Sequence, residues 1–101
     1  MSKKSAVVRI KVKPGRGGDV IAAFEGAREH VAGEAGTLLY TLHRSDSDEN
    51  VFFVTEIYAD QAGLDAHMAG PAMAALAGIA DAVEEGGVDL QFATPVVSGK
   101  D

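Results

Sequence analysis

The sequence predicts one α+β domain whose elements follow the order β-α-β-β-α-β. Four segments carry the alternating or continuously apolar pattern of strands, and two regions repeat apolar residues every three or four positions, as helices do. With 101 residues, of which 47% are hydrophobic, the chain has the length and the apolar content of one domain with a real core. We therefore predict a single domain over residues 1–101, with a core of about residues 6–97 and short flexible ends.

The first strand is predicted at residues 6–12, where apolar side chains alternate with basic ones from position 8 onward. The glycine-rich turn at residues 14–18 lacks the Gly-Lys-Ser/Thr and GxGxxG patterns of phosphate-binding loops, so we interpret it as a connection. Asp19 caps or opens the following helix by placing a negative charge at its positive end, and Gly33 is a natural stop. The apolar face of this helix comprises Val20, Phe24, Ala27 and Val31.

The second and third strands are predicted at residues 37–44 and 51–58, joined by a polar loop at residues 45–50. The loop is acidic, but it lacks the glycine and the distal glutamate of a calcium-binding loop. We therefore interpret it as a hairpin connection. Tyr40 and Leu42 share one face of the second strand.

Asp60 is the expected N-cap of a short helix at residues 61–68. Pro71 suits the first turn of a further helix, and Gly86-Gly87 is expected to end it. The three- and four-residue spacing of this helix is carried by Met73, Leu76, Ala80 and Val83. The last strand is predicted to alternate over residues 88–96.

This order of elements is the ferredoxin-like arrangement, in which two helices cover one face of a four-stranded antiparallel sheet. Pro95 places the end of the last strand at a sheet edge, because proline donates no hydrogen bond to a neighbouring strand. Residues 98–101 are expected to form a loose tail.

Both faces of the third strand are apolar, with Phe53 and Ile57 on one and Phe52 and Val54 on the other. One face can pack on the helices, and the second would then expose an apolar patch larger than monomers usually tolerate. We therefore predict a homodimer that packs sheet against sheet about a twofold axis. Phe52→Asp, taken as a change on that sheet face, is expected to give monomers or unfolded chain.

Composition excludes several classes of function. A net charge of −6 argues against nucleic-acid binding, which needs a clustered basic surface. The chain has no cysteine, which excludes disulfides, thiol catalysis and thiolate metal sites. No apolar stretch is long enough for a signal peptide or a membrane span, so we expect a soluble, cytoplasmic protein without a membrane partner.

Three groups of residues match the motifs of one known family. These are Glu34-x-Gly36-x-x-x-Tyr40-x-Leu42-x-Arg44, then Val51-Phe52, then Glu56-x-Tyr58-x-Asp60-x-x-x-Leu64-x-x-His67. They resemble the antibiotic biosynthesis monooxygenase (ABM) domain, over about residues 6–97. The resemblance implies a small dimeric α+β barrel and, in some members, cofactor-free oxygenation of quinol-like or anthrone-like aromatics. Other members resemble haem-degrading enzymes or an isomerase of a phosphorylated sugar-like signal.

The chain departs from the family pattern at several positions. Tyr58 stands where tryptophan is common, which keeps an aromatic plane and adds a hydroxyl. Many members carry Ser/Thr-Pro-His where this chain has Gly70-Pro71-Ala72, so a second histidine is missing. The haem-degrading branch uses an Asn, a Trp and a His ligand, and Val8, His67 and Ala77 occupy those places. With no axial histidine at position 77, haem degradation is not expected.

Cofactor-free oxygenation needs a base, hydrogen-bond donors for the developing anion and a dry pocket. His67 is the candidate base, because an unperturbed imidazole titrates near neutral pH. Tyr58 and Glu56 complete the candidate catalytic set, and neither a metal nor a cofactor is expected. The candidate substrate-binding residues are Arg9, Tyr40, Phe24, Phe53, Leu64, Met68, Met73 and Leu76. The apolar members of this set are expected to form pocket walls between helices and sheet.

Each candidate also has a structural interpretation. His67 can be a buried histidine bonded to Glu56, and Glu56 can be held by a backbone amide or by Arg44. The two tyrosines can be core aromatics with one satisfied hydroxyl each. The histidines at positions 30, 43 and 67 have no metal-ligand spacing.

Three functions therefore remain open. The first is a monooxygenase-like enzyme acting on an aromatic or quinol-like metabolite, which an apolar pocket would favour. The second is an isomerase of a small polar or phosphorylated metabolite with His67 as proton shuttle, which a cationic pocket around Arg9 or Arg44 would favour. The third is a non-catalytic small-molecule-binding dimer, which a filled interior and a surface-exposed His67 would favour. The fold alone does not decide among them.

Overall fold

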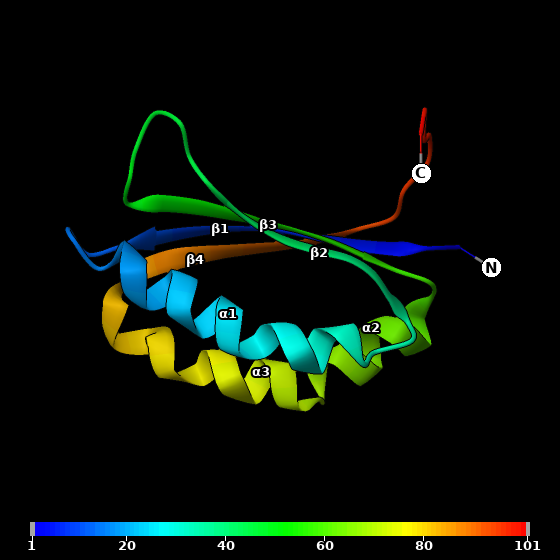
Figure 1. Cartoon of the computed structure of the whole chain (residues 1–101). Coiled ribbons are helices and arrows are strands. Elements are labelled where there is room, and N and C mark those ends of the chain that lie inside the picture. The colour runs from blue at the N-terminus through cyan, green and yellow to red at the C-terminus, as the bar shows by residue number, and fades with distance from the viewer. Residues whose placement is uncertain (1, 101) are drawn as a thin grey trace.

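Two layers make up the molecule, a sheet of four antiparallel strands and a group of helices that covers one of its faces (Figure 1). The structure, a computed structural model, describes residues 2–100. Its elements are β1 (Lys4–Val12), α1 (Gly17–Ala32), β2 (Thr37–Arg44), β3 (Val51–Tyr58), α2 (Gln61–Met68), α3 (Pro71–Leu76), the 3₁₀ helix η1 (Ala77–Ala82) and β4 (Val83–Ala93). The strand order β2-β3-β1-β4 confirms the predicted ferredoxin-like fold.

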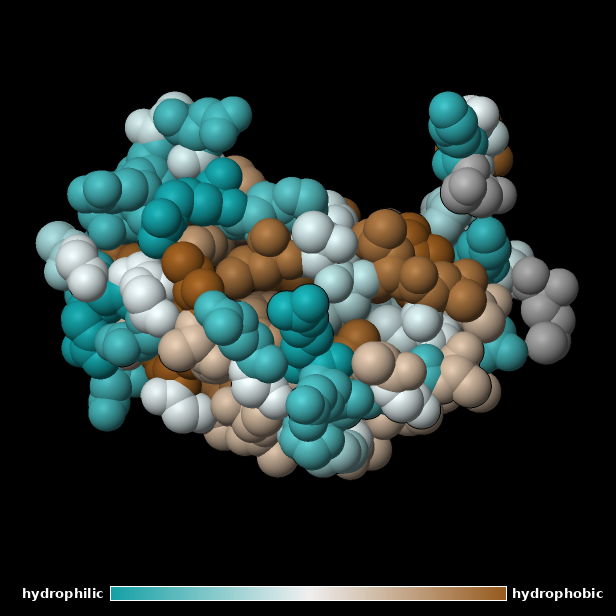
Figure 2. Space-filling model, in the orientation of Figure 1, coloured by the Kyte–Doolittle hydropathy of each residue, from teal (hydrophilic) through white to brown (hydrophobic). Residues whose placement is uncertain are grey.

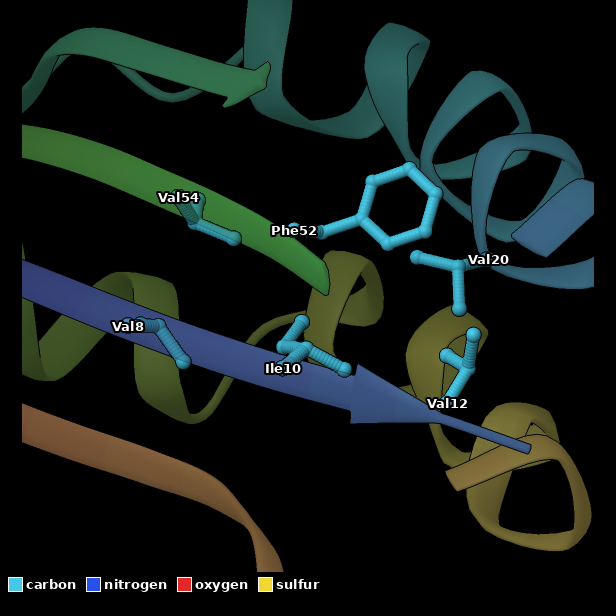
Figure 3. Close-up of a cluster of buried hydrophobic side chains, with 6 residues drawn as sticks. All are labelled: Val8, Ile10, Val12, Val20, Phe52 and Val54. Carbon is cyan, nitrogen blue, oxygen red and sulfur yellow. The ribbon is translucent and has the colours of Figure 1, made fainter. Parts of the chain in front are cut away.

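The hydrophobic core lies between the sheet and the helices, at the end of the molecule where β1 leads into α1. Its buried members are Val8, Ile10, Val12, Val20, Phe52 and Val54, which Figure 3 shows converging from β1, β3 and α1. Phe52 is 1% exposed and is one of the largest fully buried side chains. Burying a side chain of this size contributes about 1.5–3 kcal/mol to stability, so this cluster anchors α1 on the sheet.

The two faces of β3 are the reverse of those expected. Phe52 and Val54 face the helices, whereas Phe53, which was expected in the pocket between helices and sheet, lies on the helix-free face and is 37% exposed. Phe52 is thus a core residue, and its predicted place on the sheet face that meets a second copy is wrong. When both faces of a strand are apolar, alternation separates them but does not say which one meets the helices.

The C-terminal third differs most from the sequence-based expectation. The helix predicted from Pro71 to the Gly86-Gly87 pair is α3 followed by η1, and β4 already begins at Val83. The two glycines lie inside β4, where the pairing with β1 is irregular between Ile10 and Val12. Gly86 has a φ of +68°, and a Cβ at Gly87 would lie 2.5 Å from the carbonyl oxygen of Lys11. The glycines therefore permit an irregular strand and a close backbone approach, and do not cap a helix.

The ends of several elements agree with their predicted signals. The side chain of Asp60 caps α2 by accepting a hydrogen bond from the Gly63 N–H at 2.8 Å. Asp19 lies in the first turn of α1 without capping it, and accepts a hydrogen bond from Arg16 Nε at 2.5 Å. β4 is an edge strand, as Pro95 suggested, but it ends at Ala93.

Two segments project from the helix-free face of the sheet. Figure 1 shows the β2–β3 loop and the C-terminal tail rising on the side opposite the helices. Val96 and Val97, in the tail, are each 90% exposed. The predicted flexible ends include residues 1 and 101, which lie outside the described residues. Within residues 2–100, no helix is long and apolar enough to cross a membrane.

Candidate functional site

A close backbone contact brings the candidate site together. The turn between α1 and β2 passes α2 so tightly that a Cβ at Gly36 would lie 2.6 Å from the Cα of Gly63. The Ala59 N–H also donates to the Gly36 carbonyl at 2.9 Å, which ties this turn to the end of β3. Because no side chain separates the turn from α2, Glu34 at its start reaches His67, which lies one helical turn beyond Gly63.

His67 is the centre of a buried polar cluster. It is 1% exposed, and its Nδ1 lies 2.7 Å from Oε1 of Glu34. Its ring lies between two tyrosine rings, with centroid distances of 5.0 Å to Tyr40 and 5.4 Å to Tyr58. The partner of His67 is thus Glu34, and the expected bond to Glu56 is not present.

Glu34 is held by the turn that it belongs to. The Thr37 hydroxyl donates to Glu34 Oε1 at 2.7 Å, so this one oxygen serves both Thr37 and His67. The other oxygen, Oε2, is buried and has no hydrogen-bond partner among the described residues. It points toward the junction of α2 and α3, where a Cβ at Gly70 would be 3.6 Å away.

The second carboxyl group of the cluster belongs to Glu56, which is paired with Tyr58. These two residues share one face of β3, and the Tyr58 hydroxyl donates to Glu56 Oε1. Burial raises the pKa of Glu56 above its ordinary value, with the Glu34 charge adding to this; the hydrogen bond from Tyr58 and the charge of His67 act in the opposite direction. Burial, and then the hydrogen bond to Glu56, raises the pKa of Tyr58. The pair is therefore a neutral phenol that donates to a carboxyl group whose pKa is raised.

Tyr40 connects this cluster to the surface. It lies directly opposite Glu56 in the pairing of β2 with β3, so both side chains point to the helix side of the sheet. Its ring stacks on Phe24 of α1 with centroids 5.8 Å apart. Burial, followed by the charges of Glu56 and Glu34, raises the pKa of Tyr40. Tyr40 thus stays protonated and is suited to donate a hydrogen bond.

Two cavities flank the cluster. The α1–β2 groove has a volume of about 390 Å³ and is lined by Ile21, Phe24, Glu25, Arg28, Val31, Tyr40, Thr41 and Leu42. The α2–β4 cavity, also of about 390 Å³, is lined by Lys4, Gln61, Leu64, Asp65, Met68, Phe92, Ala93 and Thr94. Figure 2 shows apolar side chains gathered along the boundary between the sheet and the helices, interrupted near the middle by hydrophilic ones. His67 lines neither cavity, and Tyr40 links it to the first.

The predicted site residues separate into distinct places. His67, Tyr58, Glu56 and Tyr40 form the cluster, and Phe24 borders it. The other predicted residues are found as follows: Leu64 and Met68 line the α2–β4 cavity, Met73 and Leu76 are half-buried on α3, and Arg9 and Phe53 lie on the helix-free face of the sheet.

Two further sequence-based expectations concern charged residues. The partner of Glu56 is the Tyr58 hydroxyl, and not Arg44 or a backbone amide as the structural interpretation suggested. Arg44 lies over the Phe52 ring instead, 5.2 Å from its centroid. Glu34 was not singled out as a site residue, although it opens the Glu34-x-Gly36 motif.

Within residues 2–100, no group of three or more His, Asp or Glu side chains is arranged to hold a metal ion.

The fold and the cluster together define a small α+β protein with a buried His–Glu–Tyr centre beside an apolar groove. The family model for antibiotic biosynthesis monooxygenase matches residues 5–78. The chain therefore belongs to this family, which confirms the resemblance of its motifs. No curated protein matches the chain.

Solved structures of similar shape span nearly the whole chain. A Bacteroides thetaiotaomicron protein, whose name proposes an antibiotic biosynthesis monooxygenase, is 25% identical, with 99% of this chain and 95% of that one covered and a TM-score of 0.85. A Nitrosomonas europaea protein with the same proposed name is 18% identical over 94% and 91%, with a TM-score of 0.84. A Mycobacterium tuberculosis protein is 18% identical over 98% and 100%, with a TM-score of 0.86.

Proposed function

We propose that this chain is a cofactor-independent monooxygenase that oxidises an aromatic or quinol-like small molecule with O₂. One observation carries the proposal: His67 is buried between two tyrosine rings and bonded to a carboxyl group, beside an apolar groove whose wall includes one of those tyrosines. Membership of the ABM family supports the same class of reaction.

The roles in the cluster follow from proton affinities. Because their pKa values are raised, Tyr40 and Tyr58 remain neutral near pH 7 and act as hydrogen-bond donors. Tyr58 is already engaged with Glu56, which leaves Tyr40 to donate to the developing anion of the substrate. Removal of a proton then falls to His67, since imidazole is the side chain whose ordinary titration range includes neutral pH.

In the proposed reaction the substrate lies in the α1–β2 groove with its ring against Phe24 and Tyr40. Tyr40 forms the wall between this groove and His67, so its side chain has to turn before the substrate reaches the imidazole. With an anthrone-like substrate, His67 takes a proton from the activated CH₂ group, and the carbanion reacts with O₂ to form a C–O bond. The CH₂ group becomes C=O by losing two hydrogens and four electrons, and O₂ takes up all four electrons. One oxygen atom remains as the carbonyl oxygen, and the other leaves as water with the two hydrogens. The substrate supplies every electron, so no external reductant is needed.

The isomerase alternative has less support. It was tied to a cationic pocket around Arg9 or Arg44, and both side chains lie away from His67. Arg28 at the rim of the α1–β2 groove is an exposed cation that suits a phenolate or carboxylate on an aromatic substrate.

The proposal includes a homodimer that forms through the helix-free face of the sheet. Val7, Leu39 and Phe53 on that face are 49%, 43% and 37% exposed in the single chain. Leu38, Leu39 and Ile57 also line a cavity of about 600 Å³ beneath the C-terminal tail. A second copy of the chain would remove this apolar surface from water and close the sheets into a dimeric α+β barrel.

The test is oxygen uptake with a panel of hydroquinones and anthrones, in the presence of a metal chelator. The wild type is expected to exceed the background rate with at least one substrate, and His67→Ala is expected to lower the rate by at least about tenfold. His30→Ala is the matched control, because His30 is exposed in the last turn of α1. Uptake that stays at background across the panel, or that is unchanged in His67→Ala, contradicts the proposal.

A further inference from the structure

Two carboxyl groups lie in the cluster, and they have different partners. Glu56 receives a hydrogen bond from a tyrosine, whereas Glu34 is bonded to the imidazole itself. The Glu34 side chain is 15% exposed and that of His67 is 1% exposed, so this pair lies largely out of water. The nitrogen of His67 that faces Glu34 is Nδ1, and this choice of nitrogen determines what the other one can do.

We propose that Glu34 is a positioning residue that fixes His67 in the tautomer with the proton on Nδ1, and thereby leaves Nε2 as the basic nitrogen. Oε1 of Glu34 already accepts from the Thr37 hydroxyl, and an ionised carboxylate is acceptor-only. The Nδ1 atom at 2.7 Å from the same oxygen must therefore carry a hydrogen and donate it. In the neutral imidazole, the lone pair is then on Nε2.

The unpaired oxygen of Glu34 supports this role. A carboxylate whose oxygens accept several hydrogen bonds has its charge spread over those donors, whereas Oε2 of Glu34 is buried without one. The negative charge of Glu34 acts on the other groups of the cluster, because it is one of the causes that raise the pKa values of Tyr40, Glu56 and Tyr58. The same charge is available to stabilise the imidazolium that forms when Nε2 accepts a proton.

The backbone fixes the distance between the two groups. Glu34 is held by a turn in which the Thr37 N–H donates to the Glu34 carbonyl at 3.1 Å, and that turn packs on α2 through the contact of Gly36 with Gly63. The carboxylate and the imidazole are therefore carried by two segments in direct backbone contact. Such support is what a catalytic base needs to keep one orientation.

This inference rests on the proposed role of His67 as a base, but its test needs no substrate. Long-range ¹H–¹⁵N NMR of ¹⁵N-histidine-labelled protein reports which ring nitrogen carries the proton in the neutral form. The wild type is expected to show a protonated Nδ1 and an unprotonated Nε2 for His67. The exposed His30 and His43 are assigned by substituting each in turn. His30 provides the reference within the same sample, whereas Nε2 of His43 is hydrogen-bonded to the Thr55 hydroxyl at 3.0 Å.

Three variants separate positioning from structural support. Glu34→Ala removes the acceptor, so the His67 nitrogens are expected to lose their single tautomer. Glu34→Gln is expected to keep the tautomer, because the amide oxygen still accepts from Nδ1, while the charge is lost. Thr37→Val leaves the carboxylate in place and is expected to keep both the tautomer and the charge.

Activity gives the second arm of the test. Glu34→Ala is expected to lower the maximal rate of oxygen uptake by about 10²-fold, mainly in kcat, with Glu34→Gln between it and the wild type. Glu29→Ala, an exposed acid on α1, is the control. A wild-type His67 with its proton on Nε2, or a tautomer unchanged in a folded Glu34→Ala, overturns the inference. The expected tautomers together with background oxygen uptake would instead contradict the proposed reaction and leave the positioning role standing.

Discussion

Gly36→Ala tests whether the glycine contact really sets the geometry of the site. The backbone at Gly36 is not in the left-handed region, so alanine can adopt its conformation, and any loss of stability comes from crowding. The added Cβ would lie 2.6 Å from the Cα of Gly63, and ordinary contacts begin at 3.4 Å, so the two segments must separate by 0.8 Å. The obstacle is backbone, and no side-chain rotation can relieve it.

The expected loss follows from two opposing terms. Overpacking of this kind costs about 1–3 kcal/mol, and the reduced freedom of the unfolded chain returns about 0.4–1 kcal/mol. With the middle of each range, the net loss in the free energy of unfolding is about 1.3 kcal/mol, which corresponds to a fall in Tm of roughly 5–10 °C for a domain of this size. Because Glu34 lies on the displaced turn, the same change should lengthen the Glu34–His67 bond and lower activity.

Thermal and urea unfolding followed by circular dichroism measure this loss. Protein concentration has to be the same for every variant, because the proposed dimerisation would make Tm depend on it. The matched control is Gly26→Ala in α1, where the added Cβ meets no atom within 4 Å apart from its chain neighbours and the backbone of its own helix. Alanine is expected to stabilise there by about 0.5–1 kcal/mol. Equal behaviour of the two variants would refute the claim that the Gly36–Gly63 contact is tight.

Two further predictions concern charge and assembly. The folded pKa of Glu56 is raised, so the stability associated with its protonated form is complete below the unfolded pKa of about 4.3 and is lost as pH rises through the folded value. Glu56→Gln, which stays neutral, should therefore gain in unfolding free energy relative to the wild type between pH 4 and pH 8; urea titrations showing no such gain would disprove this. Phe53→Asp on the helix-free face should give folded monomers by light scattering, with Glu49→Asp in the β2–β3 loop as control, and a dimer that persists in Phe53→Asp would argue against that interface.

The order and type of most elements could be predicted because local signals agreed with the fold. Alternating and continuously apolar segments identified β1, β2 and β3, and the cap at Asp60 placed the start of α2. The end of the last helix was missed because Met73, Leu76, Ala80 and Val83 keep helical spacing through a 3₁₀ turn and into β4. A glycine pair can end a helix in one protein and permit an irregularity within a strand in another, and the backbone that packs beside it determines which of the two forms.

The site could be predicted in its members but not in its bonds. His67, Glu56, Tyr58 and Tyr40 were all selected, yet the partner of His67 is a turn residue 33 positions away in the sequence. That contact depends on the glycines of two separate segments meeting, and no periodicity within one segment encodes it. The motif Glu34-x-Gly36 did contain the signal: an acid beside a glycine in a short turn is a place where the backbone can approach another element closely.

The stability that the protein loses by burying this polar cluster argues for a chemical role. A histidine that only filled the core would need one backbone carbonyl or water as a partner, and an apolar side chain of similar size would commonly be as stable. Here two carboxyl groups and one imidazole lie within the same buried region, one carboxylate oxygen has no partner, and the second acid has a raised pKa. Such an arrangement lowers stability while holding groups that gain and lose protons near one another, which is the combination found at reactive sites. The cluster lies beside the α1–β2 groove, the proposed substrate site, with Tyr40 at the boundary between them.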